Sequence, residues 1–134
     1  MKLLVFVFSL LSALLAPTEQ ATLAISGLDP VLLIEGSRQE GSEELTATYD
    51  GFSYRFATEK SLSDFRAAPD RYAVQLRGAC PVRPDLKGKP EIFLVHEGRI
   101  YLFFSEHCRA RFEASPDVFL DALDVRGSAG TSGL

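Results

Sequence analysis

The sequence has few residues of the kinds that carry chemistry. Its 134 residues include only two cysteines and two histidines, so a disulfide framework is limited to one bridge. Lysine and arginine total 14 against 18 aspartates and glutamates, which gives a formal net charge of −4 at pH 7. The chain therefore offers no basic field to release counterions from a nucleic acid, and nucleic acid is excluded as a partner.

Motifs of the common enzyme classes are missing as well. The chain contains no glycine-rich phosphate loop, no Gly-x-Ser-x-Gly elbow and no His-Glu-x-x-His helix. A dyad of Cys108 with a histidine would need an imidazole placed on the thiol, which adjacency in sequence does not provide. We therefore expect no enzyme and no catalytic residues, and thiol redox activity is the one exception left open.

No apolar run is long enough to span a membrane. The longest, Leu3 to Ala16, follows the positive charge of Lys2 and falls short of the roughly 20 residues that a spanning helix needs. This pattern is typical of a secretory signal, so residues 1–21 are predicted to be a signal peptide, without a clearly marked cleavage site. The mature protein is predicted to be periplasmic or secreted, and to meet a membrane only through this signal or an uncleaved N-terminal segment.

What the sequence does contain is an internal repeat. Residues 44–72 align without a gap with residues 91–119. The matched pairs include Gly51 with Gly98, Tyr54 with Tyr101, Phe56 with Phe103, Phe65 with Phe112, and Pro69 with Pro116. We interpret the shared aromatic residues as core, because each copy needs one.

Each copy predicts a β-hairpin. Apolar residues alternate on both sides of Asp50-Gly51 in the first copy and of Glu97-Gly98 in the second. An acidic residue followed by glycine between two alternating runs is a strong hairpin signal.

Helices are predicted to follow each hairpin. Thr58 in the first copy and Ser105 in the second stand where a helix N-cap is expected, with apolar residues at helical spacing after them. Pro69 and Pro116 then end that helix and open another short one.

We therefore predict an α+β fold of two tandem units, each a β-hairpin followed by two short helices, packed into one compact body. A unit of about 45–50 residues is at the lower limit for folding alone, so the two are expected to pack on each other. The units are placed at residues 22–79 and 80–124. The small, polar end, residues 125–134, is predicted to be a disordered tail.

The motifs of both copies resemble the YHS domain. In the first copy, "GLDPV" followed by "YDGFSYRF" and a closing "GAC" is similar to its Gly-x-Asp-Pro-Val start, its Tyr-x-Gly-x-x-Tyr-x-Phe motif and its Gly-x-Cys end. The second copy, from "CPVRPD" to "SPDVF", resembles the Cys-Pro-Val variety of the family and the related TRASH-type modules. The resemblance implies a small α+β module of exported bacterial proteins and heavy-metal ATPases, with metal binding through cysteines.

The resemblance also implies which residues hold the metal. In the cysteine-bearing varieties, sulfurs stand at the Cys-Pro-Val start, at the end of the second strand and four residues later. This sequence keeps the first as Cys80 and the third as Cys108, and has Phe104 at the second. In the first copy the three positions are held by Asp29, Ala57 and Ser61. The first copy is therefore interpreted as a degenerate scaffold.

Three interpretations of Cys80 and Cys108 stay open. As thiolates joined by His107 or His96 they would hold copper(I) or zinc, and Cys108 would lie in a helical first turn that favours an anion. As a disulfide, the bond that export favours, they would close a loop of about 28 residues and contribute about 3 kcal/mol. As unpaired buried cysteines they would be small apolar residues without chemistry.

The predicted function is that of an exported, YHS-like, metal-binding module for copper or zinc, with Cys80, Cys108 and His107 as ligands. The alternative is a non-catalytic structural or interaction module in which the two cysteines are bridged or buried. The expected partner is correspondingly a metal ion or another protein. In the alternative, His107 is a surface helix residue and His96 an exposed residue at the end of a strand.

Overall fold

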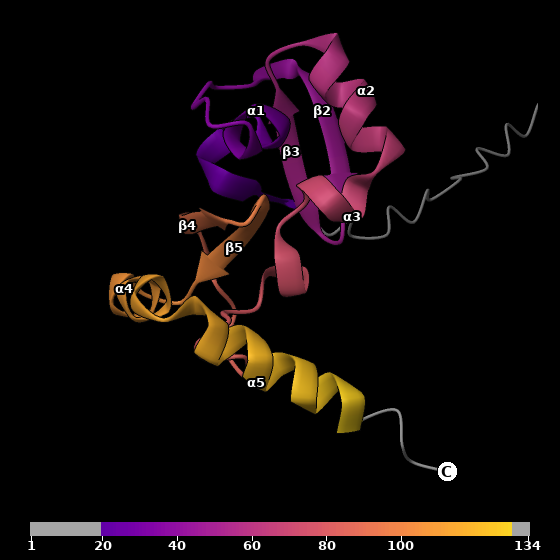
Figure 1. Cartoon of the computed structure of the whole chain (residues 1–134). Coiled ribbons are helices and arrows are strands. Elements are labelled where there is room, and N and C mark those ends of the chain that lie inside the picture. Colours follow the sequence, from indigo (N-terminus) through magenta and orange to yellow (C-terminus); the bar gives the residue numbers. More distant parts are fainter. Residues whose placement is uncertain (1–19, 130–134) are drawn as a thin grey trace, which may run out of the picture.

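The computed structural model describes residues 20–129, with side chains for residues 20–127. This part of the chain forms a compact α+β fold with two small sheets and five α-helices (Figure 1). The predicted signal peptide lies outside the described residues except for its last two positions. None of the helices between residues 20 and 129 has both the length and the apolar composition needed to cross a membrane.

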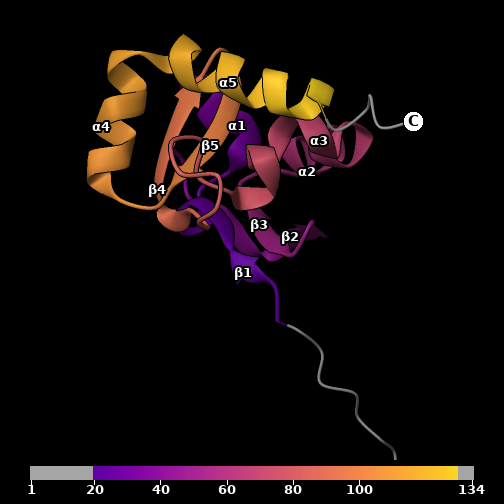
Figure 2. The same ribbon diagram turned by 90° about the horizontal axis from the view of Figure 1, so that it is seen from below.

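The first sheet has three strands in the order β1-β3-β2. Its strands are β1 (Thr22–Leu23), β2 (Ser42–Tyr49) and β3 (Phe52–Phe56). β2 and β3 form the predicted antiparallel hairpin, and β1 lies parallel to β3 (Figure 2). Asp50 and Gly51 have φ values of 49° and 81°, as a two-residue turn that matches the twist of its strands requires. The first hairpin prediction is therefore confirmed.

The second sheet is a two-stranded antiparallel hairpin. It consists of β4 (Lys89–His96) and β5 (Arg99–Phe103). The turn again has two residues with positive φ, 48° at Glu97 and 71° at Gly98. The second hairpin prediction is confirmed in the same way.

Five α-helices surround the sheets. They are α1 (Pro30–Ile34), α2 (Glu59–Ala67), α3 (Pro69–Tyr72), α4 (Glu106–Ala114) and α5 (Pro116–Ala129). Both predicted N-caps are confirmed. Thr58 Oγ1 accepts a hydrogen bond from the N–H of Ser61 at 3.1 Å. Ser105 Oγ accepts one from the N–H of Cys108, also at 3.1 Å.

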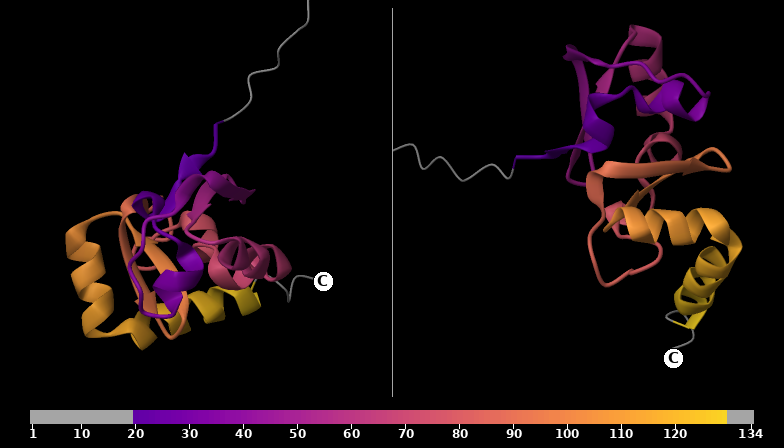
Figure 3. Two further views of the ribbon diagram at one scale, coloured as in Figure 1. Left: turned by 90° about the horizontal axis from the view of Figure 1, so that it is seen from above. Right: turned by 90° about the vertical axis from the view of Figure 1, so that its left-hand side faces the viewer.

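The first and the last helix, α1 and α5, differ from the prediction. α1 was not predicted, because its five residues are too few to show an apolar period. α5 continues to Ala129, so residues 125–129 are helical and the predicted disordered tail is wrong for them. Phe119 and Leu123, one turn apart and partly buried, give α5 an inner face that anchors it after it turns away from α4 (Figure 3). Residues 130–134 lie outside the described part of the chain.

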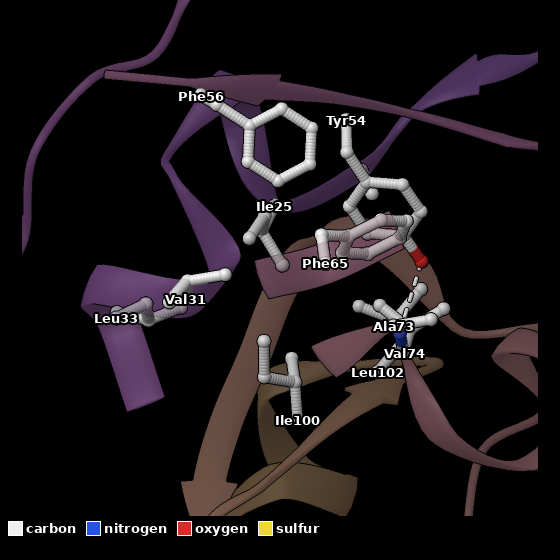
Figure 4. Close-up of a cluster of buried hydrophobic side chains, with 11 residues drawn as sticks. Ile25, Val31, Leu33, Tyr54, Phe56, Phe65, Ala73, Val74, Ile100 and Leu102 are labelled. Carbon is white, nitrogen blue, oxygen red and sulfur yellow. Dashed lines mark hydrogen bonds between the residues drawn. The ribbon is translucent and has the colours of Figure 1, made fainter. Parts of the chain in front are cut away.

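Two buried clusters hold these elements together. The main cluster consists of Ala24, Ile25, Val31, Leu33, Tyr54, Phe56, Phe65, Ala73, Val74, Ile100 and Leu102 (Figure 4). The second, which we call the thiol cluster, consists of Cys80, Ile92, Tyr101, Phe103, Cys108 and Phe112. The aromatic residues predicted as core from the repeat are all buried, and that prediction is confirmed.

β5 is a wall shared by the two clusters. Successive side chains of a strand point to opposite faces. Ile100 and Leu102 accordingly enter the main cluster, while Tyr101 and Phe103 enter the thiol cluster. All four are at most 8% exposed, although the sheet that contains them has only two strands.

Tyr54 links the main cluster to the segment that follows α3. Its ring is fully buried, and its phenol oxygen accepts a hydrogen bond from the N–H of Val74 at 2.9 Å (Figure 4). Burial raises the pKa of Tyr54 from its ordinary value of 10 to about 12, against the opposing effect of the Val74 hydrogen bond.

This pKa predicts an alkaline loss of stability. The folded protein keeps a proton that the unfolded chain releases above pH 10, so the contribution is complete below pH 10 and disappears as the pH rises toward 12. At its limit the loss is about 2–3 kcal/mol. Tyr54→Phe should lower the free energy of unfolding by about 1 kcal/mol at pH 8, because the Val74 N–H loses its acceptor. Urea unfolding from pH 8 to 11.5 should then show a shallower alkaline decline for the variant, and parallel declines would contradict the assignment.

Candidate functional site

Cys80 begins a tight loop that leads into β4. It follows η2 (Gln75–Gly78), a 3-10 turn whose last residue has a φ of 84°. The N–H of Cys80 donates to the carbonyl of Leu86 at 3.0 Å, and the N–H of Leu86 donates to the carbonyl of Arg83 at 2.8 Å. These bonds fold the loop back on itself. The side chain of Cys80 is 0% exposed.

Cys108 is the third residue of α4 and faces the sheet. It lies one turn before Phe112, and both side chains belong to the thiol cluster, as their spacing predicted. Cys108 is 6% exposed, and neither it nor Cys80 is part of a disulfide. The structure therefore brings the chain's two cysteines into one apolar cluster without a bond between them.

Arg83 stands on the loop that follows Cys80 and pairs with Asp85. Arg83 donates from Nε to Asp85 Oδ1 at 3.2 Å and from Nη2 to Asp85 Oδ2 at 3.0 Å. The hydrogen bond to Asp85 raises the pKa of Arg83, and negative charge on Cys108 and Cys80 raises it further. The guanidinium is exposed and paired with Asp85, and the two sulfurs affect it less than Asp85 does.

The structure does not assemble the predicted set of three ligands. His107 is exposed on α4, whereas Cys80 and Cys108 are buried. Between residues 20 and 127, no group of three or more histidine, cysteine, aspartate or glutamate side chains is gathered in the manner of a metal site.

His96 occupies a different environment from the one expected. Its side chain is 21% exposed, and its ring stands edge-on to Phe112 with centroids 5.6 Å apart. Nε2 is buried and has no hydrogen-bond partner among the described residues. The interpretation of His96 as an exposed strand-end residue is therefore wrong. The signal that was missed is alternation, because His96 shares a strand face with Ile92 and Leu94, which pack in the thiol cluster.

The first half of the chain holds a polar pair at the aligned positions. Asp29 and Ser61 are the two polar residues that are buried in the described part of the chain. Asp29 Oδ1 accepts hydrogen bonds from the N–H groups of Val31 and Leu32 at 2.9 and 3.1 Å. Its Oδ2 accepts one from the N–H of Ala57 at 2.8 Å. Asp29 thus caps the start of α1 and also ties it to the residue that follows β3.

Comparisons with family models, curated proteins and solved structures found no match for this chain. The thiol cluster offers two soft sulfur atoms in an apolar environment. Such a pair suits a thiophilic ion such as copper(I).

Proposed function

We propose that this chain is an exported protein of two YHS-like units and that the second unit binds copper(I) through Cys80 and Cys108. The observation that carries the proposal is that the chain's two cysteines share one buried cluster. The first unit serves as a scaffold, because its buried polar pair is already satisfied within the protein.

Corresponding strand pairings support the division into two units. In the first half, β1 pairs in parallel with β3 through Leu23 and Ser53. In the second half, Val74 forms a parallel bridge with Ile100. Ser53 and Ile100 are 47 residues apart, which is the offset of the internal repeat. Leu23 and Val74 are 51 residues apart, which is the offset between Asp29 and Cys80. Both halves thus place a short parallel segment beside the second strand of a hairpin.

Corresponding glycines give the same support. A Cβ added at Gly41 would lie 2.2 Å from the carbonyl carbon of Arg55. A Cβ added at Gly88 would lie 2.7 Å from the carbonyl carbon of Leu102. Because real Cβ atoms do not approach a backbone this closely, both positions require glycine for close contact between strands. The two glycines and their two neighbours are again aligned in the repeat.

The number of ligands favours copper(I) over zinc. Thiolate ligands select copper(I) by their softness, and two of them suffice for a low coordination number. Zinc would require further ligands, and the described residues gather none at this place.

Copper(I) binding can be tested by replacing Cys80 and Cys108 with the residues found at the corresponding positions of the first unit. In the variant Cys80→Asp/Cys108→Ser, the second unit carries the pair that the first unit holds as Asp29 and Ser61. We expect this variant to fold, because the aligned positions accommodate a buried carboxylate and hydroxyl, and to bind no copper(I). The wild-type protein, reduced and titrated anaerobically against a chromogenic copper(I) chelator, should bind one equivalent.

The reverse variant, Asp29→Cys/Ser61→Cys, is the matched gain-of-function control. We expect the folded variant to bind two equivalents of copper(I) instead of one, at a lower stability, because Asp29→Cys also removes the acceptor of three backbone N–H groups. Circular dichroism checks that the variant used in the titration is folded. Equal copper(I) binding by the wild type and the Cys80→Asp/Cys108→Ser variant would refute the proposal. That result would favour a non-catalytic structural module with buried or bridged cysteines, which titration of free thiols before and after denaturation would then distinguish.

A further inference from the structure

An apolar groove of about 260 Å³ runs between α5 and the loop that follows Cys80. Its lining residues are Pro81, Val82 and Pro84 on the loop, and Val118, Phe119, Ala122, Leu123 and Arg126 on α5. The groove lies outside the thiol cluster, but Val82 and Phe119 pack against that cluster from the groove side.

The outer face of α5 continues this apolar surface. Val118 and Val125 are 65% and 69% exposed, which makes them the most exposed large apolar residues in the described part of the chain. With Ala122 they occupy positions i, i+4 and i+7, so they form one row along the helix. No other described element covers this row.

An acidic row borders the valine row on the side away from the groove. Asp117, Asp121 and Asp124 also stand at i, i+4 and i+7, rotated from the valine row by about a quarter turn. Asp117 and Asp121 are exposed and take part in none of the ion pairs between residues 20 and 127.

This charge distribution argues against a second copy of the chain as the occupant. If two α5 helices packed antiparallel through their valine rows, matching flanks would meet, and the acidic row of one copy would face that of the other. Like charges placed opposite one another are destabilising. A partner with positive charge on that flank would instead be attracted along several turns.

We propose that the groove and the valine row of α5 bind a basic amphipathic helix of a partner protein. Its apolar side chains would enter the groove over Phe119 and Ala122, and its lysines or arginines would lie over Asp117 and Asp121. This is the helix-in-groove mode of recognition, in which a few apolar anchors at helical spacing provide affinity. The 14 residues of α5 give a contact length of about 21 Å. The proposal does not rest on copper binding.

Two designed helical peptides of about 14 residues provide the probe. They share a leucine face, and one carries lysines along its flank where the other carries glutamates. Fluorescence anisotropy with the full chain should show the lysine peptide binding at least about tenfold more tightly than the glutamate peptide at about 50 mM salt, where charges are weakly screened. The difference should shrink as salt is raised.

Two variants test the two parts of the surface. Asp117→Lys/Asp121→Lys should reverse the preference between the peptides. Val118→Asp/Val125→Asp adds negative charge to the site, yet should weaken the lysine peptide at least about tenfold by removing the apolar contact. Asp70→Lys, at the position aligned with Asp117 but on α3, is the matched control and should change nothing.

Three results would overturn the proposal. The first is that neither peptide binds. The second is that the Val118→Asp/Val125→Asp variant binds the lysine peptide as well as the wild type, because binding would then be electrostatic attraction without a groove. The third is a concentration-dependent dimer in analytical ultracentrifugation that this variant abolishes, which would assign the face to a second copy. Copper(I) titration of the same variants should remain at the wild-type stoichiometry, so the two proposals fail separately.

Discussion

Replacing Phe112 by alanine is expected to lower the free energy of unfolding by about 3–5 kcal/mol. Phe112 is fully buried at the centre of the thiol cluster. Its ring centroid lies 5.2 to 5.6 Å from those of Phe103, Tyr101 and His96, and 6.3 Å from that of Phe119. Removal of the ring leaves a cavity that four neighbouring rings from β4, β5 and α5 cannot fill without moving. Urea unfolding followed by far-ultraviolet circular dichroism measures the loss.

A second consequence of Phe112→Ala distinguishes the thiol cluster from the rest of the core. Cys108 lies one turn before Phe112 on the same helix face, so the cavity should expose its sulfur and accelerate alkylation by iodoacetamide under native conditions. Val118→Ala is the control. Val118 is 65% exposed, and its replacement should change stability by no more than about 0.5 kcal/mol. If Phe112→Ala lowered the free energy of unfolding by less than about 1.5 kcal/mol, the neighbouring side chains would have to fill the cavity or be less tightly packed around the ring than described.

Replacing Asp29 by alanine should cost about 3 kcal/mol or more, although no opposite charge is involved. Its buried carboxylate accepts three backbone hydrogen bonds, from the N–H groups of Val31, Leu32 and Ala57. Each buried donor that loses its acceptor costs about 1–3 kcal/mol. Alanine would leave all three without a partner, and would detach the start of α1 from the end of β3.

Asparagine at this position separates the two roles of the carboxylate. Asp29→Asn keeps one oxygen for the start of α1 but presents an NH2 group to the N–H of Ala57, so its cost should lie between those of the wild type and Asp29→Ala. Asp70→Ala, an exposed aspartate at the start of α3, should be nearly neutral in the same denaturation assay. Equal stability of Asp29→Asn and the wild type would show that the bond to Ala57 contributes nothing.

The elements with a local signal were predictable from the sequence. The hairpin turns at Asp50 and Glu97 were indicated by the glycine that follows each of them. The N-caps at Thr58 and Ser105 were indicated by a hydroxyl residue followed by apolar residues at helical spacing. α5 is longer than predicted, because the small residues at its end were interpreted as a disordered tail. A helix that is already anchored by Phe119 and Leu123 can continue through such residues.

The turns that lead into each half had no such signal. Ile25 and Ser26 have φ values of 47° and 55°, and Leu76 and Arg77 have 58° and 54°. A β-branched isoleucine rarely adopts this conformation. It does so here because Ile25 is fully buried in the main cluster, so packing determines a backbone that local preference would reject.

The candidate site was predictable in its residues but not in its geometry. The resemblance to a known domain pointed to Cys80 and Cys108, and their burial in one cluster depends on how α4 lies against β5, which no local pattern contains. His107 was favoured as a ligand by its place beside Cys108, yet neighbouring helix residues point about 100° apart. His96 was underestimated because its position at the end of a strand was given more weight than its place in the alternation of β4.

The shared wall formed by β5 has a consequence for how the chain acquires its structure. During synthesis, residues 22–79 are complete about twenty residues before Ile100 and Leu102 are added. Until then, the main cluster lacks the two β5 side chains that belong to it. The main cluster is therefore built from residues of both halves of the chain. The molecule should therefore fold and unfold as one cooperative whole.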